Sequence, residues 1–410
     1  MTRKNYIGHA RSALAVSFFK SGWLLVAVLP LTQLGGRALF NITAGIFAVW
    51  GLLSLWGHHR SLDRATTLLY LAVLGVFLLG IPGAIDPAGG LRIWAGFLAP
   101  SLAVLLVQAA LWKSPNALDR LLSAIALFGG ITLVGLYLQL PYYVFELSGQ
   151  PFDPKIQLRE DLLPFLLPFF LGWIWQHGNG VRRYWSMASV VIAVLAYVVL
   201  SEGRAALLGA IIALIVFSRL VLGWRLRWTI ALAAAALSIA IIANTGPFRR
   251  STLDPEHPLN GFTSGRTALW QQALANPPER PWVGVGLGNG RYATNILGFE
   301  LNGVHIQVQH LHNFLLDAWY ETGLLGVGTL VTFIGAVFWR VARKWNQLSL
   351  PDRQKAGILL AAALAIVAAA LLSFSYTSRY FACLFICFGA LIYLTADFNK
   401  ASDGMTKATA

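Results

Sequence analysis

The chain has 410 residues, of which 57% are hydrophobic and 12% charged, and it carries a formal net charge of +14. A soluble protein of this length would contain about a quarter charged residues, so the composition excludes a water-soluble fold and indicates a polytopic membrane protein. The basic residues lie at the ends of apolar segments instead of forming one patch, which is typical of membrane orientation signals and argues against nucleic acid as a partner.

The apolar runs predict an all-α polytopic membrane protein with about 12 transmembrane helices. Each run is about 20 residues long, is rich in Leu, Ala and Gly, and lacks the period-two alternation of barrel strands. The expected spans are residues 12–32, 37–57, 65–82, 91–112, 119–140, 161–177, 184–201, 204–221, 226–244, 312–340, 355–375 and 379–398.

These spans divide the chain into four parts. Residues 1–244 hold the first nine helices, residues 245–311 form one large loop with short amphipathic helices, residues 312–398 hold the last three helices, and residues 399–410 form a polar tail. An even number of spans places both termini on one side, and most of the 31 basic residues fall on that side. The positive-inside bias therefore predicts cytoplasmic N- and C-termini and a loop outside the cytoplasm.

Two arginines at expected helix starts are candidates for an anion site. Arg204 follows Glu202 and Gly203 at a tight turn, where the helix dipole disfavours a cation by roughly 0.3 to 1 kcal/mol. A bound phosphate would offset this cost, whereas an ion pair with Glu202 or contact with lipid headgroups is the alternative explanation. Arg266 begins a short amphipathic helix that is expected on the outer leaflet. The apolar side of that helix holds Leu269, Trp270 and Leu274.

A glycine-rich stretch follows in the loop, Val283-Gly284-Val285-Gly286-Leu287-Gly288-Asn289-Gly290. Alternating glycines allow the backbone to approach a ligand closely. The stretch lacks the strand-to-helix context of a nucleotide fold, so we reject a dinucleotide site.

His312 is the most informative position, because it begins a helix that carries two carboxylates, Asp317 and Glu321, in the outer half of the expected bilayer. Ionisable groups there are costly and are expected to face a polar cavity. An imidazole close to arginines would stay neutral and could act as a base. Two alternatives remain: His312 caps the helix, or it binds a metal together with His305 and His310, although no nearby carboxylate completes a familiar metal-ligand spacing.

The pattern His312-Asn313, nine residues, Gly323, two residues, Gly326 resembles the O-antigen ligase and polymerase superfamily, as do the segments around Arg204 and Gly265-Arg266. The expected topology, with one large loop between helices 9 and 10, is most similar to the O-antigen ligase branch. The resemblance implies a GT-C-like glycosyltransferase of the bacterial inner membrane with a periplasmic loop and active site.

The resemblance also implies roles for individual residues. His312 would be the catalytic residue, and Arg204 and Arg266 would contact the undecaprenyl diphosphate of the glycan donor. Arg291 is a further candidate cation, and the candidates for supporting the site are Asn313, Asp317 and Glu321. The acceptor would be lipid A-core, in an environment of membrane lipids.

The chemistry of such a transfer is compatible with these residues. The lipid diphosphate is already a good leaving group, so the protein has to supply a base for the acceptor hydroxyl and positive charge for the departing diphosphate. Arginine suits the second task because it stays charged and binds phosphate oxygens bidentately. We therefore expect a metal-independent, inverting reaction with no cofactor.

Two other functions compete with the ligase. An O-antigen polymerase would use the same donor, but polymerases tend to carry Arg-x10-Gly elements in two substantial loops, and Arg159, Arg266, Arg280 and Arg291 have no Gly eleven positions on. A lipid-linked oligosaccharide transporter would be expected to show paired, broken helices in two related halves with charges at mid-membrane. Here the notable charges gather at the outer surface.

Overall fold

The computed structural model describes residues 3–55, 62–112, 116–147, 160–201, 203–225, 266–293, 296–301 and 304–396, together with residues 227, 229 and 231. These residues are helical apart from one hairpin and the connecting turns. The helices are α1 (Arg3–Thr32), α2 (Gly36–Leu55), α3 (Arg64–Leu79), α4 (Pro87–Ser101), α5 (Ala103–Leu111), α6 (Ala117–Leu147), α7 (Leu163–His177), α8 (Gly180–Leu200), α9 (Arg204–Leu220), α12 (Arg266–Ala275), α13 (Phe314–Lys344), α14 (Leu350–Ala370) and α15 (Ala382–Thr395).

The helices agree with a multi-pass membrane protein. Seven helical segments in the described part of the chain are long and apolar enough to cross a membrane. The apolar part of α1, Lys20–Thr32, and α15 are shorter apolar helices. Eleven of the expected spans coincide with helix, one of them as two pieces, because residues 91–112 divide into α4 and α5 next to Pro100. The span 226–244 falls almost entirely outside the described residues, so the total of about 12 stays a prediction.

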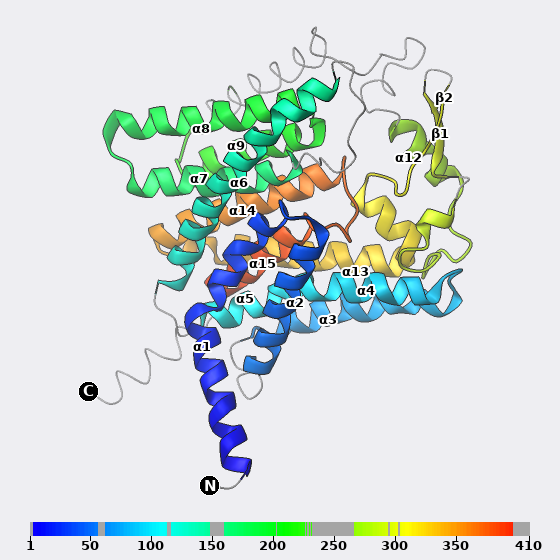
Figure 1. The fold of residues 1–410 in the computed structure, drawn as a ribbon, viewed down its shortest axis with the longest axis horizontal. Helices are drawn as coiled ribbons and strands as arrows, with labels where there is room; N and C mark the ends of the chain where they lie inside the picture. Colours follow the sequence, from blue (N-terminus) through cyan, green and yellow to red (C-terminus); the bar gives the residue numbers. More distant parts are fainter. Residues whose placement is uncertain are drawn as a thin grey trace.

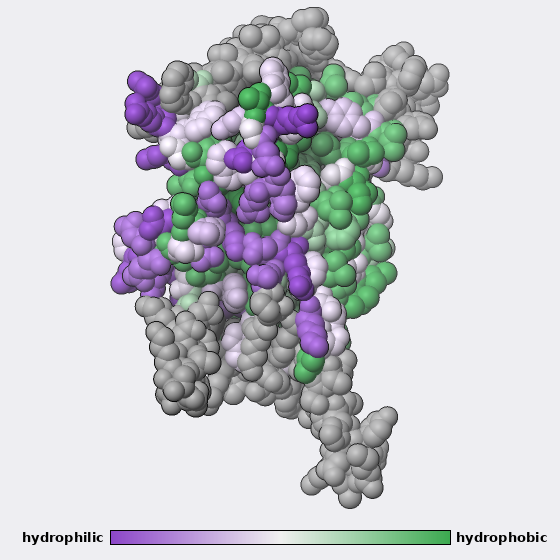
Figure 2. Space-filling model, turned by 90° about the vertical axis from the view of Figure 1, so that its left-hand side faces the viewer, coloured by the Kyte–Doolittle hydropathy of each residue, from purple (hydrophilic) through white to green (hydrophobic). Residues whose placement is uncertain are grey.

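The outer surface of the helical body is apolar where lipid would meet it. Large side chains such as Ile42, Val49, Leu138 and Ile192 lie exposed on α2, α6 and α8. Figure 1 shows the turn between α7 and α8 at one end of the molecule, and Figure 2 views that end: hydrophilic residues gather in a band across it, beside a hydrophobic flank. An exposed apolar belt between polar ends is the arrangement that a bilayer stabilises.

Helix α14 lies at the centre of the bundle, where it packs against α7, α9 and α15. Small residues allow this close packing: a Cβ built on Gly209 of α9 would lie 2.8 Å from the Ala365 carbonyl oxygen, and one on Gly357 would lie 2.9 Å from Val221. These contacts make α9 and α14 antiparallel. The first residue of α9, Arg204, is therefore near the end of α14.

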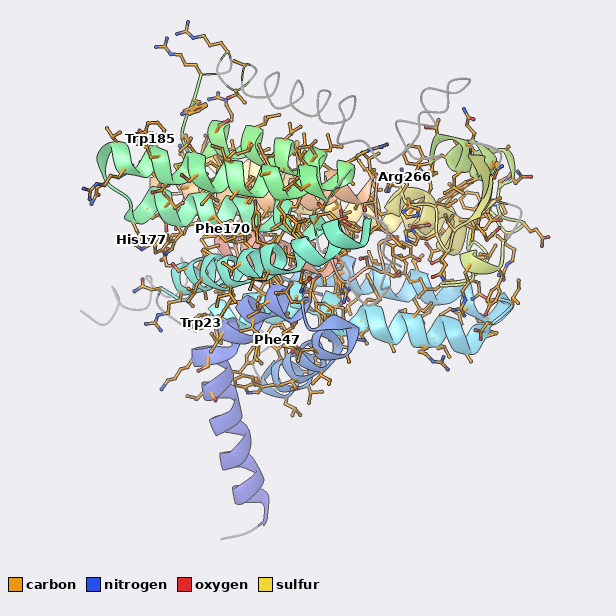
Figure 3. All side chains as sticks on the ribbon, turned by 45° about the horizontal axis from the view of Figure 1, so that its top comes forward. Trp23, Phe47, Phe170, His177, Trp185 and Arg266 are labelled. Carbon is orange, nitrogen blue, oxygen red and sulfur yellow. The ribbon has the colours of Figure 1, made fainter. Side chains whose placement is uncertain are left out.

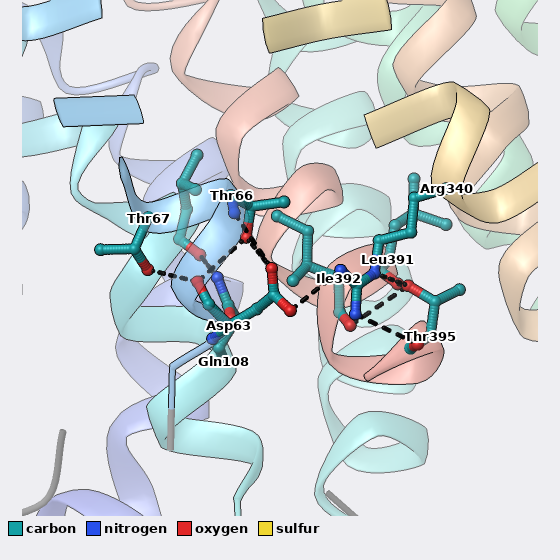
Figure 4. A network of polar contacts seen from close by, with 9 residues as sticks. Asp63, Thr66, Thr67, Gln108, Arg340, Leu391, Ile392 and Thr395 are labelled. Carbon is teal, nitrogen blue, oxygen red and sulfur yellow. Dashed lines mark hydrogen bonds and ion pairs between the residues drawn. The ribbon is translucent and has the colours of Figure 1, made fainter. Parts of the chain in front are cut away.

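A polar network fastens the bundle at the end opposite the large loop (Figure 4). The Arg340 guanidinium on α13 forms an ion pair of 2.9 Å with Asp63, which caps the start of α3. Arg340 also donates to the Thr395 hydroxyl on α15, and the side chain of Gln108 on α5 accepts from the Asp63 backbone amide. The network joins four helices that are far apart in the sequence.

The described part of the large loop gathers at the other end of the bundle (Figure 1). It contains α12, as the sequence predicts, and a hairpin of β1 (Gly298–Leu301) and β2 (Val304–Gln307), which it does not. The all-α fold class is confirmed in its helices and did not include this short hairpin. The dipeptide between the strands is Asn302-Gly303, which favours two-residue hairpin turns, and it was the available signal.

Helix α13 is broken at Gly323, whose φ of 66° and ψ of −169° are outside the helical range. The glycine-rich stretch packs against the break. The Leu324 and Leu325 amides donate to the Pro281 and Trp282 carbonyls at 2.9 and 3.2 Å. In return, Val285 and Gly286 donate to the Tyr320 and Glu321 carbonyls at 3.0 and 2.9 Å. The loop thus satisfies the backbone groups that the break releases, which is required at membrane depth.

Candidate functional site

His312 lies in the turn directly before α13 and has a defined side-chain orientation. Its Nδ1 is 2.8 Å from the Ser373 carbonyl oxygen. Because a carbonyl oxygen only accepts, the hydrogen-bond pattern assigns the hydrogen to Nδ1 and leaves the lone pair on Nε2. A neutral imidazole with a free Nε2 lone pair is the form that can act as a general base.

The backbone around His312 is held by Asn313 and by Asp317 of α13. His312 itself has a φ of 54°, an uncommon conformation for a residue with a side chain. Asn313 caps the helix, since its side-chain oxygen accepts from the Leu315 and Leu316 amides at 3.0 and 3.2 Å. Asp317 accepts from the Leu311 amide at 2.8 Å. The cap is therefore Asn313, and His312 is free of that role.

His310 packs against His312 and is neutral as well. The two ring centroids are 4.1 Å apart, and the His312 amide donates to His310 Nδ1 at 3.2 Å. That nitrogen also lies 3.8 Å from the Asp317 carboxylate. We do not regard this contact as an ion pair, because burial, with a contribution from Arg266, lowers the pKa of His310 to about 4.

The protonation of His312 is set by the same surroundings. Burial, the neighbouring His310 and the Arg266 guanidinium lower the pKa of His312 to about 3, and the hydrogen bond to Ser373 opposes the shift. The imidazole is therefore neutral throughout the physiological range, as expected from a nearby arginine.

Arg266 is the first residue of α12 and reaches the same connector as His312. Its Nη1 donates to the Leu372 carbonyl oxygen, one residue before Ser373. Burial lowers the pKa of Arg266, the Asp161 carboxylate opposes this shift, and the Arg204 guanidinium adds to it. The two arginines of the sequence prediction are thus close enough to repel each other.

Two like charges that lie this close repel each other, and a bound anion would offset the repulsion. Arg204 and Arg266 each start a helix, and α7 and α13 also begin at this end of the bundle. Helix N-termini carry partial positive charge. The two guanidinium groups and the helix N-termini together make this end of the bundle positively charged. A bound diphosphate would stabilise such a region.

The connector between α14 and α15, residues 371–381, joins the parts of this site. Leu372 and Ser373 bind Arg266 and His312 through their carbonyl groups. The Ser373 hydroxyl donates to Asp161 at 2.9 Å, and the Tyr376 hydroxyl donates to Glu321 at 2.7 Å. The connector was expected to be a short turn after a helix ending at residue 375, whereas α14 ends at Ala370.

Ser373, Tyr376 and Asp161 were therefore missed from the sequence. A signal for the first two existed, since five of the six residues 373–378 carry a hydroxyl group. Asp161 gave no comparable signal, because a single carboxylate at the start of an apolar run is ordinary.

Glu321 joins α13 to the connector and to the glycine-rich stretch. It receives the Tyr376 hydroxyl and hydrogen bonds from the backbone of Gly288 and Gly290. The glycines of the stretch thus approach α13 closely; a Cβ on Gly284 would lie 2.4 Å from the Glu321 carbonyl carbon. From the sequence, these glycines were expected to let the backbone approach a ligand, whereas in the structure they let it approach the broken helix α13.

Arg291 lies at a different position from the other candidate cations. Its guanidinium forms an ion pair of 3.0 Å with Asp86 in the turn between α3 and α4. Asn289 holds the same turn, accepting from the Asp86 amide at 2.7 Å and donating to its carbonyl at 3.2 Å. Arg291 thus fastens the loop to the bundle, and its charge acts on Glu321.

The metal alternative has no support in the described residues, where no cluster of three or more His, Cys, Asp or Glu side chains could hold an ion. The side chain of His305 lies outside the described part. His310 and His312 use one ring nitrogen each for the contacts given above.

A large apolar groove lies elsewhere on the molecule. It has a volume of about 890 Å³ and is lined by residues of α1, α6, α7 and α8, among them Trp23, Phe170 and Trp173. Figure 3 shows Arg266 at one end of the helical body and His177 and Trp185 at the other. His177 and Trp185 line an adjoining groove. These grooves are therefore remote from His312.

The fold and the site define a multi-pass membrane protein in which a neutral imidazole and two guanidinium groups converge at one end of the bundle. Residues 188–331, about a third of the chain, match the family model described as O-Antigen ligase. The matched region is similar to the O-antigen ligase/polymerase superfamily and includes Arg204, Arg266 and His312. No curated protein sequence gave a significant match.

Proposed function

We propose that the protein is an O-antigen ligase, which transfers a polysaccharide from undecaprenyl diphosphate to lipid A-core at the periplasmic face of the bacterial inner membrane. The observation that carries the proposal is the oriented His312 side chain beside Arg266, with Nδ1 at the Ser373 carbonyl oxygen, an arrangement that puts the imidazole lone pair on Nε2. A base and a cation are the two groups that this reaction needs.

In the proposed reaction, Nε2 of His312 takes the proton of an acceptor sugar hydroxyl. The oxygen attacks the anomeric carbon of the donor while the bond from that carbon to the diphosphate oxygen breaks. Undecaprenyl diphosphate leaves with the electron pair, and Arg204 and Arg266 stabilise its negative charge. Attack from the opposite side inverts the anomeric centre, and the guanidinium groups supply the charge that a metal would otherwise contribute.

The direct test uses purified protein, donor lipid and lipid A-core, with the product separated on a gel. His312→Ala is expected to lower the transfer rate by about 100-fold or more. His177→Ala is the matched control, because its Nδ1 also lies 2.9 Å from a backbone carbonyl oxygen but at the far end of the bundle (Figure 3). Near-normal transfer by His312→Ala would remove His312 from the role of base.

Two further measurements test the finer parts of the proposal. Transfer should persist in excess EDTA, and its complete loss would reject the metal-free reaction. The lipopolysaccharide of a deletion strain separates ligase from polymerase: polymerised but unattached O-chain indicates the ligase, whereas single repeats attached to the core indicate the polymerase.

A further inference from the structure

A second carboxylate is linked to His312 through one residue of the connector. Ser373 makes two hydrogen bonds in opposite directions: its carbonyl oxygen accepts from His312 Nδ1 at 2.8 Å, and its hydroxyl donates to Asp161 Oδ2 at 2.9 Å. Asp161 and Ser373 are 212 positions apart in the sequence. The contact therefore joins the start of α7 to the end of α14.

The connector needs such an anchor because its backbone is irregular. Residues 371–381 form turns between the end of α14 and the start of α15. Two consecutive carbonyl groups in it, those of Leu372 and Ser373, orient Arg266 and His312 respectively. A shift of the connector would move the guanidinium and the imidazole together.

Asp161 is suited to fix the connector. It lies in the short helical turn Glu160–Leu162, directly before α7, where a carboxylate is favoured by the helix dipole. The following residues, Leu163 to Leu167, are all buried in the core. Asp161 thus ties the turns of the connector to the buried start of α7.

We propose that Asp161 is a positioning residue for His312, acting through the Ser373 hydroxyl to hold the Ser373 carbonyl that orients the imidazole. The expected effect of Asp161 on transfer rests on the proposed function. Its expected effect on the orientation and tautomer of the His312 imidazole does not. Asp161 touches no substrate in it and takes up no proton.

Kinetics of four variants test the proposal. Ser373→Ala and Asp161→Ala are each expected to lower kcat by about 10- to 100-fold and to change the donor KM by less than about 3-fold. The double variant should be no slower than the slower single variant, because both changes break one link. Ser373→Thr, which keeps the hydroxyl, should recover most of the rate lost in Ser373→Ala.

Thr377→Ala is the matched control in the same connector, since its hydroxyl lies 3.4 Å from that of Ser375, outside the link from Asp161 to His312. Multiplying rather than overlapping effects in the double variant would overturn the proposal. So would a raised donor KM with unchanged kcat in Asp161→Ala, which would show that Asp161 acts on the charge of Arg266 instead.

A measurement without turnover separates this inference from the proposed function. Nitrogen NMR of protein labelled with 15N-histidine, with the His312 signal assigned by its loss in His312→Ala, should show the Nδ1–H tautomer in the wild type. Ser373→Ala and Asp161→Ala should give a mixture of tautomers. An unchanged spectrum in both variants refutes the inference, whereas a changed spectrum with normal transfer by His312→Ala refutes only the proposed function.

Discussion

The break in α13 leads to a strong prediction, that Gly323→Ala destabilises the protein severely. Gly323 has a φ of 66° and a ψ of −169°, a region that is occupied essentially by glycine alone. A Cβ built on it would lie 2.3 Å from the Trp282 carbonyl carbon and 2.4 Å from the Val283 nitrogen. Both atoms belong to the backbone of the loop, so no side-chain rotation relieves the clash.

The magnitude follows from two contributions. Holding an alanine in this conformation costs about 1–3 kcal/mol. Moving the loop away would also break the four backbone hydrogen bonds that Pro281, Trp282, Val285 and Gly286 make with α13, each with a net contribution of about 0.5–1.5 kcal/mol. Because the clash is with backbone atoms, both contributions apply, and together they predict a loss of about 3–9 kcal/mol.

The matched control is Gly328→Ala in the same helix. A Cβ built there meets no atom of the described residues within 4 Å, and Gly328 has no unusual φ. Replacing an unconstrained helical glycine by alanine stabilises a helix by about 0.5–1 kcal/mol. The two substitutions are chemically identical but should have opposite signs.

The assay is thermal unfolding of the purified protein in detergent with a thiol-reactive fluorescent dye. The two free cysteines, Cys383 and Cys387, are buried on α15 and become reactive when the bundle opens. Gly323→Ala should lower the melting temperature by about 3–10 °C, and Gly328→Ala should leave it unchanged or slightly higher. Equal melting temperatures for the two variants would show that α13 is continuous at Gly323.

Three further predictions concern the site and the bundle. The acid limb of kcat/KM should lie below pH 5, because the pKa of His312 is lowered to about 3 and the base works only above its pKa; an ordinary imidazole would place the limb near 6.5. Burial raises the pKa of Asp161 to about 6, so its titration could also produce an acid limb, and the profile should be repeated with Asp161→Asn. A limb near 6.5 in both profiles would contradict the site geometry. Arg266→Lys keeps the charge but loses the planar fork, so the donor KM should rise by about 10-fold or more in steady-state kinetics, and an unchanged KM would exclude bidentate contact. Asp63→Ala leaves the half-buried Arg340 without its ion-pair partner, so unfolding should be easier by about 1–3 kcal/mol. Asp63→Ala combined with Arg340→Met should recover part of this loss in the same melting assay.

Much of the helical layout was predictable because the bilayer limits the choices. An apolar run of about 20 residues has to satisfy its backbone internally, so hydropathy locates helices well. The sequence also placed Arg204 and Arg266 at helix starts, where the structure has them, and His312 directly before another. Local signals were sufficient for these features.

The remaining features depend on contacts between distant parts of the chain. Hydropathy continues through Gly323, so residues 312–340 read as one uninterrupted span, and the loop that compensates for the break lies about 40 residues earlier. The link between Asp161 and Ser373 has no periodicity of its own. For this reason the sequence located the imidazole and the guanidinium groups but not the connector that orients them.

The spacing of the family pattern has a structural explanation in this arrangement. Asn313 caps the start of α13 and Gly323 breaks it, so the residues between them form a short separate helix that carries Asp317 and Glu321 on one side. Asp317 holds the Leu311 amide before His312, and Glu321 holds Tyr376 and the glycine-rich loop. Gly326 leaves room for Thr322, whose hydroxyl a Cβ at position 326 would overlap. The position of His312 thus depends on contacts at both ends of this short helix. Substitutions of Gly323 and Gly326 should therefore impair transfer, although these residues touch neither the base nor the arginines.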